Sequence, residues 1–150
     1  KENAPETESD KKEISASAEK TVDLKGTRIL LVEDNSLNRD IAKELLKSAG
    51  FIIDEAENGK IALEMLSASP DGYYKVILMD VMMPVMNGYE ASMKIRKMKS
   101  NKSSIPIVAM TANAFEEDKE QALKSGMDYF VSKPFDIKSL LSLLSEILAK

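Results

Sequence analysis

The stretch YKVILMDVMMPVMNGYE, Tyr74 to Glu90, decides the fold and raises the first question about function. Its four apolar residues at 76–79 are typical of a buried strand, and the run ends on Asp80. Pro84 and Gly88 then break the pattern. Because a buried carboxylate without a partner is costly, we expect Asp80 to have charged partners or a chemical role.

Similar apolar runs alternate with helical patterns along the chain. Further strands are expected at 28–32, 51–56, 105–110 and 129–131, and helices at 37–49, 61–66, 89–98, 115–125 and 137–148. Leu37, Ile41 and Leu45 recur every fourth residue, and together with the neighbouring Ala42, Leu46 and Ala49 they predict the apolar face of the first helix. Asn58-Gly59 predicts a turn. Five strand–helix units with buried strands indicate an α/β fold, in which helices cover both faces of a parallel sheet.

Length and composition indicate one domain with a tail. The chain has 150 residues, of which 43% are hydrophobic, as is usual for a single globular domain. Residues 1–24 are rich in charge and poor in large apolar side chains, which predicts a flexible polar linker before a domain at 25–150. Because the chain begins with Lys1, we expect it to be a piece of a longer protein.

Several classes of function are excluded by composition. The chain contains no histidine and no cysteine, so it has no Ser-His triad and no imidazole or thiolate metal ligand. It has no glycine-rich nucleotide loop, so we expect no ATP binding. The net charge of −4 predicts no nucleic-acid partner. No apolar run approaches the roughly 18 residues that span a bilayer, so we expect a cytoplasmic domain without direct membrane contact.

Polar residues follow four of the five expected strands. Glu33 and Asp34 follow the first strand, Asp80 the third, Thr111 the fourth and Lys133 the fifth. An open parallel sheet binds its ligands at the carboxyl ends of its strands. If the first and third strands are neighbours, three carboxylates converge there.

This combination of residues suits phosphoryl chemistry. Clustered carboxylates repel one another unless a cation intervenes, and oxygen ligands favour Mg²⁺ over zinc or copper. Lys133 supplies a positive charge and Thr111 a hydroxyl donor for phosphoryl oxygens. A carboxylate can also act as the nucleophile, and Asp80 is the best-placed candidate because a loop follows it.

Each residue also has a simpler interpretation when taken alone. Asp34, Asn35 or Ser36 could cap a helix. Asp80 could open a turn, Thr111 could cap the fourth helix, and Lys133 could be solvated. Only the complementary set at one edge of the sheet favours a phosphoryl site.

Four motifs carry a resemblance to a known family, namely ILLVEDN (29–35), ILMDVMMPVMNGYE (77–90), IVAMTAN (107–113) and GMDYFVSKPF (126–135). With them, residues 25–150 resemble a receiver domain of the two-component response-regulator family. The resemblance implies a flavodoxin-like fold with strand order 2-1-3-4-5 and Asp80 as the phosphoacceptor. It implies Mg²⁺, with Mn²⁺ as a substitute, held by Glu33, Asp34, Asp80 and the backbone carbonyl of Met82.

The same resemblance assigns the remaining site residues. Thr111 and Lys133 are implied to hold the phosphoryl group. Phe130 takes the place of the family's switch aromatic and is expected to respond together with Thr111. The peptide bond between Lys133 and Pro134 is expected to be cis.

The resemblance implies a phosphorelay domain that takes its phosphoryl group from a histidine kinase or a histidine phosphotransfer domain. We expect a monomer or weak dimer that promotes its own phosphorylation and dephosphorylation without being a turnover enzyme. The motifs resemble most closely the receivers of hybrid sensor histidine kinases, so the parent chain is expected to be a kinase, which can be membrane-anchored.

Three alternatives remain open. The first is a stand-alone response regulator. The second is a Mg²⁺-dependent phosphatase with an aspartyl nucleophile, although Met82 stands where such enzymes carry a second acid. The third is an interaction module of the same fold that is never phosphorylated.

Overall fold

The computed structural model describes residues 25–112, 116–133 and 136–149. The expected linker at 1–24 and the Lys133–Pro134 peptide lie outside these residues, as does Phe115 at the start of the fourth expected helix. No helix in the described ranges is long and apolar enough to cross a membrane.

Five strands alternate with helices along the chain. The elements are β1 (Arg28–Val32), α2 (Ser36–Ser48), β2 (Ile52–Ala56), α3 (Gly59–Ala68), β3 (Val76–Asp80), α4 (Gly88–Arg96), the 3₁₀ helix η1 (Asn101–Ser104), β4 (Ile107–Thr111), α5 (Glu116–Ser125), β5 (Tyr129–Ser132) and α6 (Ile137–Leu148).

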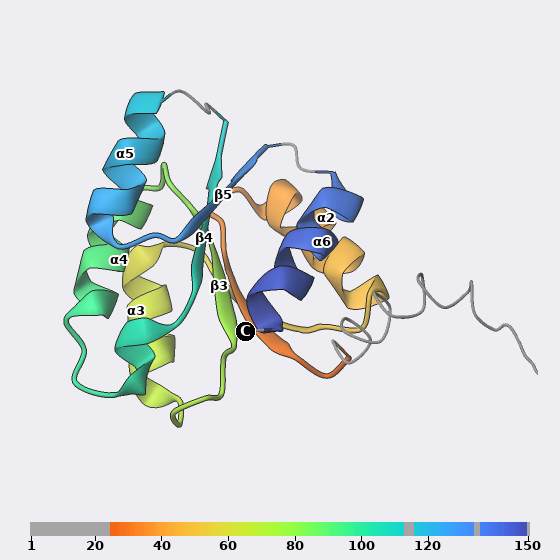
Figure 1. Ribbon diagram of the computed structural model, residues 1–150, viewed down its shortest axis with the longest axis horizontal. Helices are drawn as coiled ribbons and strands as arrows, with labels where there is room; N and C mark the ends of the chain where they lie inside the picture. Colours follow the sequence, from red (N-terminus) through yellow and green to blue (C-terminus); the bar gives the residue numbers. More distant parts are fainter. Residues whose placement is uncertain (1–24, 113–115, 134–135, 150) are drawn as a thin grey trace, which may run out of the picture.

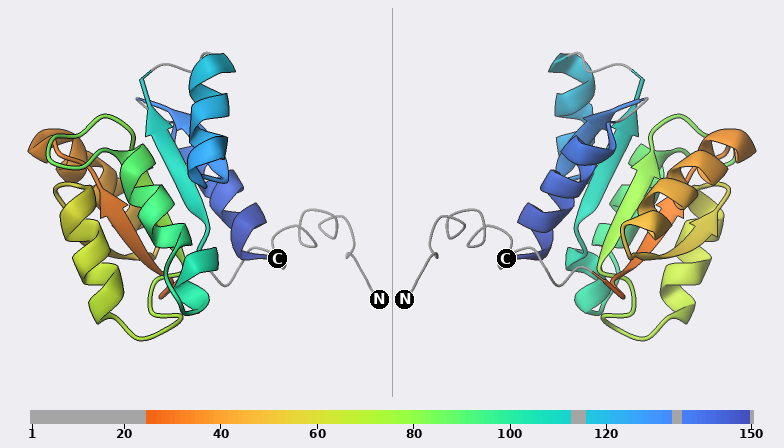
Figure 2. Two further views of the ribbon diagram at one scale, coloured as in Figure 1. Left: turned by 90° about the vertical axis from the view of Figure 1, so that its left-hand side faces the viewer. Right: turned by 90° about the vertical axis from the view of Figure 1, so that its right-hand side faces the viewer.

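The five strands form one parallel sheet in the order β2-β1-β3-β4-β5, which confirms the predicted flavodoxin-like architecture. Helices α3, α4 and α5 cover one face, and α2 and α6 cover the other (Figures 1 and 2). Because β1 and β3 are neighbours although α2, β2 and α3 lie between them in the chain, the topological switch point lies at the carboxyl ends of β1 and β3.

Alternate residues of the central strands fill two separate cores. Every residue of β3 is buried. Leu30, Ile77 and Ile107 pack toward α3, α4 and α5, while Leu31 and Leu78 pack toward α2 and α6. The continuous apolar run before Asp80 therefore reflects a strand that is buried on both faces.

The predicted apolar face of α2 is right for Ala42 and Leu46 and wrong for the residues that recur every fourth position. Leu37, Ile41 and Leu45 are exposed, with 66%, 51% and 37% of their surfaces accessible, and the buried residues of the helix are Ala42 and Leu46. The helix is rotated because two of its inward-facing positions carry basic side chains that pair with β2. An apolar stripe is thereby left on the surface.

Local capping explains the other differences from the expected elements. Asn58 and Gly59 do not form a simple turn, because Asn58 is the N-cap of α3 and its side chain accepts a hydrogen bond from the amide of Ile61 at 2.9 Å. Gly50, at φ +102°, follows the end of α2 as expected of a C-terminal glycine.

Replacing Ser92 with alanine is expected to stabilise the domain. Ser92 lies on α4, and its buried hydroxyl has no hydrogen-bond partner among the residues that the structure describes. Ser125 lies on α5 and is also buried, but its hydroxyl donates to the carbonyl of Gln121 at 2.8 Å. Both substitutions raise helix propensity, so their difference measures the hydroxyl pairing. We expect Ser92→Ala to be about 1 kcal/mol more stable than Ser125→Ala in urea unfolding; the reverse order would contradict this prediction.

Candidate functional site

The register of the sheet brings the polar strand ends to one edge. Val32 of β1 pairs with Met79 of β3, so the next residue of each chain segment, Glu33 and Asp80, lies at the same level of neighbouring strands. On the other side, Asp80 pairs with Met110 of β4. The register of the parallel strands thus brings together Glu33 and Asp80, which are 47 residues apart in the sequence.

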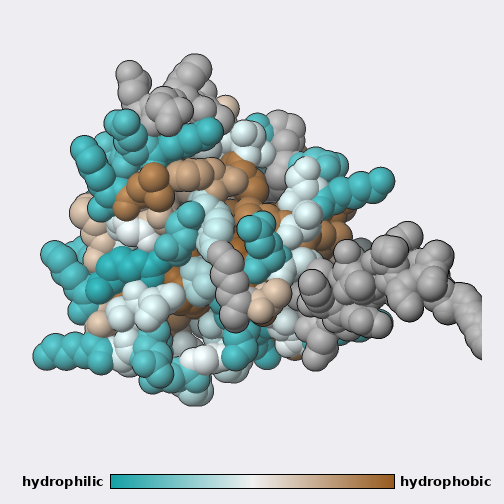
Figure 3. Space-filling view, viewed as in Figure 1, coloured by the Kyte–Doolittle hydropathy of each residue, from teal (hydrophilic) through white to brown (hydrophobic). Residues whose placement is uncertain are grey.

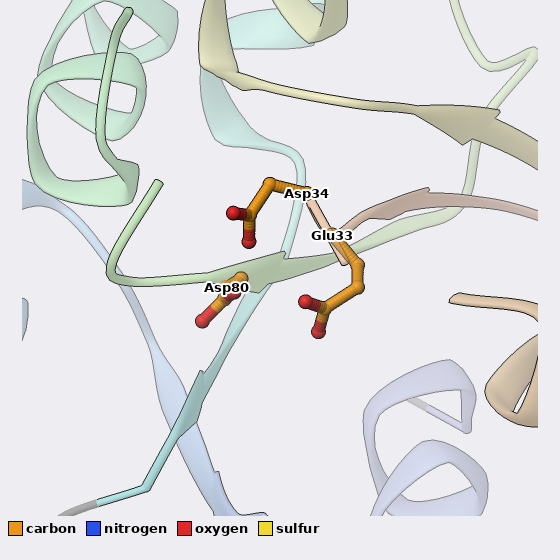
Figure 4. Close-up of side chains that lie close together, drawn as sticks. All are labelled: Glu33, Asp34 and Asp80. Carbon is orange, nitrogen blue, oxygen red and sulfur yellow. The ribbon is translucent and has the colours of Figure 1, made fainter. Parts of the chain in front are cut away.

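Three carboxylates meet at this edge and form the acidic cluster of Glu33, Asp34 and Asp80. Each offers an oxygen, and these oxygens lie within 4.8 Å of one another. Glu33 and Asp80 are buried, with only 3% of their surfaces accessible, whereas Asp34 is exposed. In Figure 4, Asp34 and Glu33 extend from the end of one strand and Asp80 from its neighbour. Two carboxylates of the cluster, Glu33 and Asp80, are therefore buried, and the third, Asp34, faces solvent.

Lys133 supplies the positive charge of the site. Its ammonium lies 3.2 Å from Oδ1 of Asp80 and 3.2 Å from Oε1 of Glu33. Its backbone amide donates to the carbonyl of Thr111 at 2.8 Å, which fixes the end of β5 beside the end of β4. The interpretation of Lys133 as a solvated side chain is therefore wrong.

Burial and crowding of like charges change the protonation of the site. Burial, and after it the charge of Glu33, raise the pKa of Asp80 to about 7, although Lys133 opposes this change. Burial lowers the pKa of Lys133, but the charges of Asp80 and Glu33 outweigh it and raise that pKa. One cation thus compensates incompletely for three clustered carboxylates.

Asn35, and not Asp34, caps helix α2. The Asn35 side chain accepts a hydrogen bond from the amide of Asn38 at 2.9 Å, and the Asn35 amide donates to Oε2 of Glu33 at 3.2 Å. The capping interpretation of Asp34 is therefore wrong. The Asp34 carboxylate stays available to the acidic cluster.

The loop after Asp80 packs closely against the start of α4. A β-carbon added to Gly88 would overlap the carbonyl oxygen of Asp80, so only glycine permits this approach. Val85 has φ +69°, and the Met86 amide donates to the carbonyl of Pro84 at 2.7 Å, which makes a strained three-residue turn. The Met82 side chain is exposed.

Thr111 and Phe130 lie together on the face of the sheet that α5 covers. Thr111 ends β4, and Phe130 lies on β5 opposite Ala109, two residues before Thr111. Both line a cavity of about 190 Å³ between the sheet and α5. The sequence predicted their proximity to the site edge but not this cavity, because its volume depends on the packing of α5.

The donor set fits a hard divalent cation. All three grouped ligands are carboxylates, a chemistry that suits Mg²⁺ or Mn²⁺ better than a soft metal. Asn35, which the sequence offered as a helix cap, also donates its amide to the Glu33 carboxylate. One further residue beside the cluster, Arg39, is not apparent from the motifs. Arg39 donates to the carbonyl of Glu33 at 2.8 Å. This contact depends on the orientation of α2, which the sequence motifs do not determine.

Comparison with known families and curated proteins agrees with this geometry. Residues 29–145 match the family model of the response regulator receiver domain. The hybrid signal transduction histidine kinase I of Dictyostelium discoideum is 40% identical over 82% of the chain and 7% of its own length. The two-component response regulator ORR41 of Oryza sativa subsp. japonica is 40% identical over 79% of the chain and 92% of its own length.

Solved structures share the fold. The receiver domain of the sensor histidine kinase PA1611 from Pseudomonas aeruginosa PAO1, which has a magnesium ion coordinated in its active-site cleft, aligns with a TM-score of 0.76 and 35% identity over 83% of the chain and 99% of that domain. A second similar structure is that of the Ssk1 receiver domain from Saccharomyces cerevisiae, solved with the histidine phosphotransfer protein Ypd1. It aligns with a TM-score of 0.73 and 29% identity, over 81% of the present chain and 88% of the aligned chain.

Replacing Asp80 with asparagine is expected to stabilise the metal-free domain at neutral pH. The ordinary pKa of an aspartate is 3.8, and that of Asp80 in the folded domain is about 7. As pH rises between these values, the unfolded chain loses its proton first, so the wild type loses stability. We expect the free energy of unfolding of Asp80→Asn to exceed that of the wild type by about 2–4 kcal/mol at pH 7.5.

Urea unfolding in the presence of a chelator measures this difference. The difference in unfolding free energy must shrink as pH falls and approach zero below about pH 3, where the aspartate is protonated in both states. An advantage that does not depend on pH, or its absence at pH 7.5, would contradict the raised pKa.

Proposed function

The chain belongs to the response regulator receiver domain family, and we propose that it accepts a phosphoryl group from a phosphohistidine onto Asp80. The observation that carries this proposal is the environment of Asp80. It is the one carboxylate of the acidic cluster that ends a central strand, is buried, and lies 3.2 Å from Lys133.

The neighbouring carboxylates are less suited to act as the nucleophile. Both oxygens of Glu33 already accept hydrogen bonds, from Lys133 and from the Asn35 amide. Asp34 is exposed, so bulk water would reach an acyl phosphate there. Asp80 combines burial with an adjoining loop whose residue Met82 faces solvent, which gives a donor a route to the carboxylate.

The proposed transfer is an in-line displacement. An oxygen of ionised Asp80 attacks the phosphorus, the bond between phosphorus and the imidazole nitrogen breaks, and the donor histidine leaves with the electron pair. Lys133, whose ammonium lies 3.2 Å from Oδ1 of Asp80, would pair with the charge of the acyl phosphate. We assign the Thr111 hydroxyl to a phosphoryl oxygen.

A divalent cation is proposed at the acidic cluster, with Glu33, Asp34 and Asp80 as its ligands and the Met82 carbonyl as a fourth. The clustered carboxylate oxygens support Mg²⁺ or Mn²⁺ there. When bound, the ion supplies positive charge that neutralises the carboxylates and the phosphoryl oxygens. The burial of Glu33 and Asp80 excludes water from the inner side of the site.

Thr111 and Phe130 are proposed to report phosphorylation to the surface. A Thr111 hydroxyl drawn toward the phosphoryl group would move away from the cavity that both residues line. Phe130 is half-buried and could move further into that space. Apolar side chains are visible between α5 and α6 where β5 forms the edge of the sheet (Figure 3), so such a movement would change a surface that partners can reach.

The donor is proposed to dock on the exposed stripe of α2, formed by Leu37, Ile41 and Leu45. Ile41 and Leu45 line a cavity of about 290 Å³ together with Glu33 and Lys133, so the stripe adjoins the site directly. An apolar surface beside a phosphoryl site suits an amphipathic helix that carries a phosphohistidine. The complex of Ypd1 with the Ssk1 receiver shows that a related domain binds a histidine phosphotransfer protein.

We propose that the parent chain is a hybrid histidine kinase, with residues 1–24 as its linker and 25–150 as a cytoplasmic receiver. Histidine kinases of Dictyostelium discoideum and Schizosaccharomyces pombe are among the similar curated proteins, and the chain spans only 7% of the first of them. The plant regulator, of which 92% is covered, supports the alternative of a stand-alone regulator. The phosphatase alternative is disfavoured because Met82 is not an acid.

Incubation with acetyl phosphate and Mg²⁺ is expected to add one phosphoryl group to Asp80. The Asp80→Asn variant should gain none, because an amide is a poor nucleophile, and the wild type should gain none in EDTA. Intact mass and peptide mapping measure both results. Full labelling of the variant, or labelling at another residue, would exclude Asp80 as the acceptor.

An Ile41→Glu substitution is expected to slow phosphoryl transfer from phosphorylated Ypd1 by about tenfold or more, because it places a charge in the proposed apolar contact. Its labelling by acetyl phosphate should not change. Leu123→Glu is the matched control, since Leu123 is similarly exposed on a helix of the opposite layer. Equal slowing in both variants, or none in Ile41→Glu, would contradict docking on α2.

A further inference from the structure

Arg39 connects the acidic cluster to the edge strand of the sheet. Its guanidinium donates from one nitrogen to the carbonyl oxygen of Glu33 at 2.8 Å. Its Nε donates to Oε1 of Glu55 on β2 at 3.2 Å. Only 15% of the Arg39 side chain is accessible, so both contacts lie largely out of water.

Glu55 is itself held in place by a second cation. Its other oxygen, Oε2, accepts a hydrogen bond from the ammonium of Lys43 at 2.9 Å. The charges of Lys43 and Arg39 lower the pKa of Glu55, with the Lys43 hydrogen bond as the largest cause. The anchor for Arg39 is therefore an ionised carboxylate with both oxygens occupied, which fixes the direction of the guanidinium.

The contact with the Glu33 carbonyl bears directly on the acidic cluster. That carbonyl belongs to the peptide that joins Glu33 to Asp34, two members of the cluster. The Glu33 amide donates to the carbonyl of Ala56 at 3.1 Å, and the Asn35 amide donates to the Glu33 carboxylate. These two bonds leave the Glu33–Asp34 peptide plane free to rotate. The hydrogen bond from Arg39 to the Glu33 carbonyl restricts that rotation.

We propose that Arg39 is a positioning residue for the divalent cation: by fixing the Glu33–Asp34 peptide, it presents the exposed Asp34 carboxylate to the ion. This inference rests on the proposed cation site. It assigns no contact between Arg39 and the ion, and it makes Glu55 act through Arg39. Partners that orient metal ligands in this way commonly alter metal affinity by about tenfold or more.

Two possible roles of Arg39, as a nearby positive charge or as a positioning residue, predict opposite changes in Mg²⁺ affinity when the residue is replaced. If the guanidinium acted only as a nearby positive charge, its removal would strengthen the attraction between the acidic cluster and Mg²⁺. If it positions the peptide, its removal weakens binding although the site becomes more negative. The sign of the change in affinity therefore distinguishes the two roles.

Isothermal titration of the intact domain with MgCl₂ at pH 7.5 provides the test. We expect the Kd for Mg²⁺ to rise about tenfold in Arg39→Gln. Arg39→Lys should also bind more weakly, because one ammonium cannot reproduce the two directed bonds of a guanidinium. Adding Glu55→Gln to Arg39→Gln should cause no further loss, since Glu55 acts through Arg39.

Arg28→Gln is the matched control. Arg28 also pairs with an acid of β2, Asp54, at 3.0 Å, but it lies at the opposite end of β1 from the acidic cluster. This variant removes the same charge and an ion pair of the same kind, so it should lose stability while keeping the wild-type Kd. If Arg39→Gln does not fold, Arg39→Lys decides the question.

The possible outcomes separate the inference from the function on which it rests. A wild-type domain that does not bind Mg²⁺ would overturn the proposed cation site. A wild type that binds, together with Arg39 variants of equal or higher affinity, would overturn only the positioning role. Equal weakening in the Arg39 and Arg28 variants would show a general effect of lost stability and would also overturn it.

Discussion

The mutual repulsion of three carboxylates at one edge of the sheet is the constraint on which the rest of the structure depends. The register of β1 and β3 brings Glu33 beside Asp80, and burial keeps water from screening them. Lys133 offsets part of this repulsion and leaves the pKa of Asp80 near 7. On the proposed function, the fold maintains a site that an added cation would stabilise, and that cation would prepare the site to receive a phosphoryl group.

The surface of α2 and the geometry of the acidic cluster have a common origin. Arg39 and Lys43 face β2 and pair with Glu55, so the helix presents these polar positions inward along with Ala42. The same rotation exposes the stripe that includes Ile41. One ion-pair network therefore accounts both for the proposed positioning of the cation ligands and for the apolar surface proposed to bind the donor.

The alternation of strands and helices could be predicted from the residues because its signals are local, whereas the strand order was implied by the family resemblance. The apolar run before Asp80 predicts a strand buried on both faces, and the position of polar residues at strand ends predicts where they meet. Periodicity could not orient α2, because its apolar residues occupy two adjacent faces, and only contacts with β2 select between them. The role of Arg39 depends on the distant residue Glu55, and the strained turn at Val85 depends on loop packing, so neither was predicted.

Paramagnetic broadening of amide NMR signals by Mn²⁺ tests most directly the claim that the strand ends form one cation site. At low Mn²⁺, the account predicts that amides of residues 33–35, 80–82 and 133 broaden first, and that excess Mg²⁺ restores them. Amides near Arg28 and Lys75, at the opposite edge of the sheet, should stay sharp. Broadening centred elsewhere, or broadening that persists unchanged in an Asp80→Asn, Asp34→Asn double variant, would contradict it.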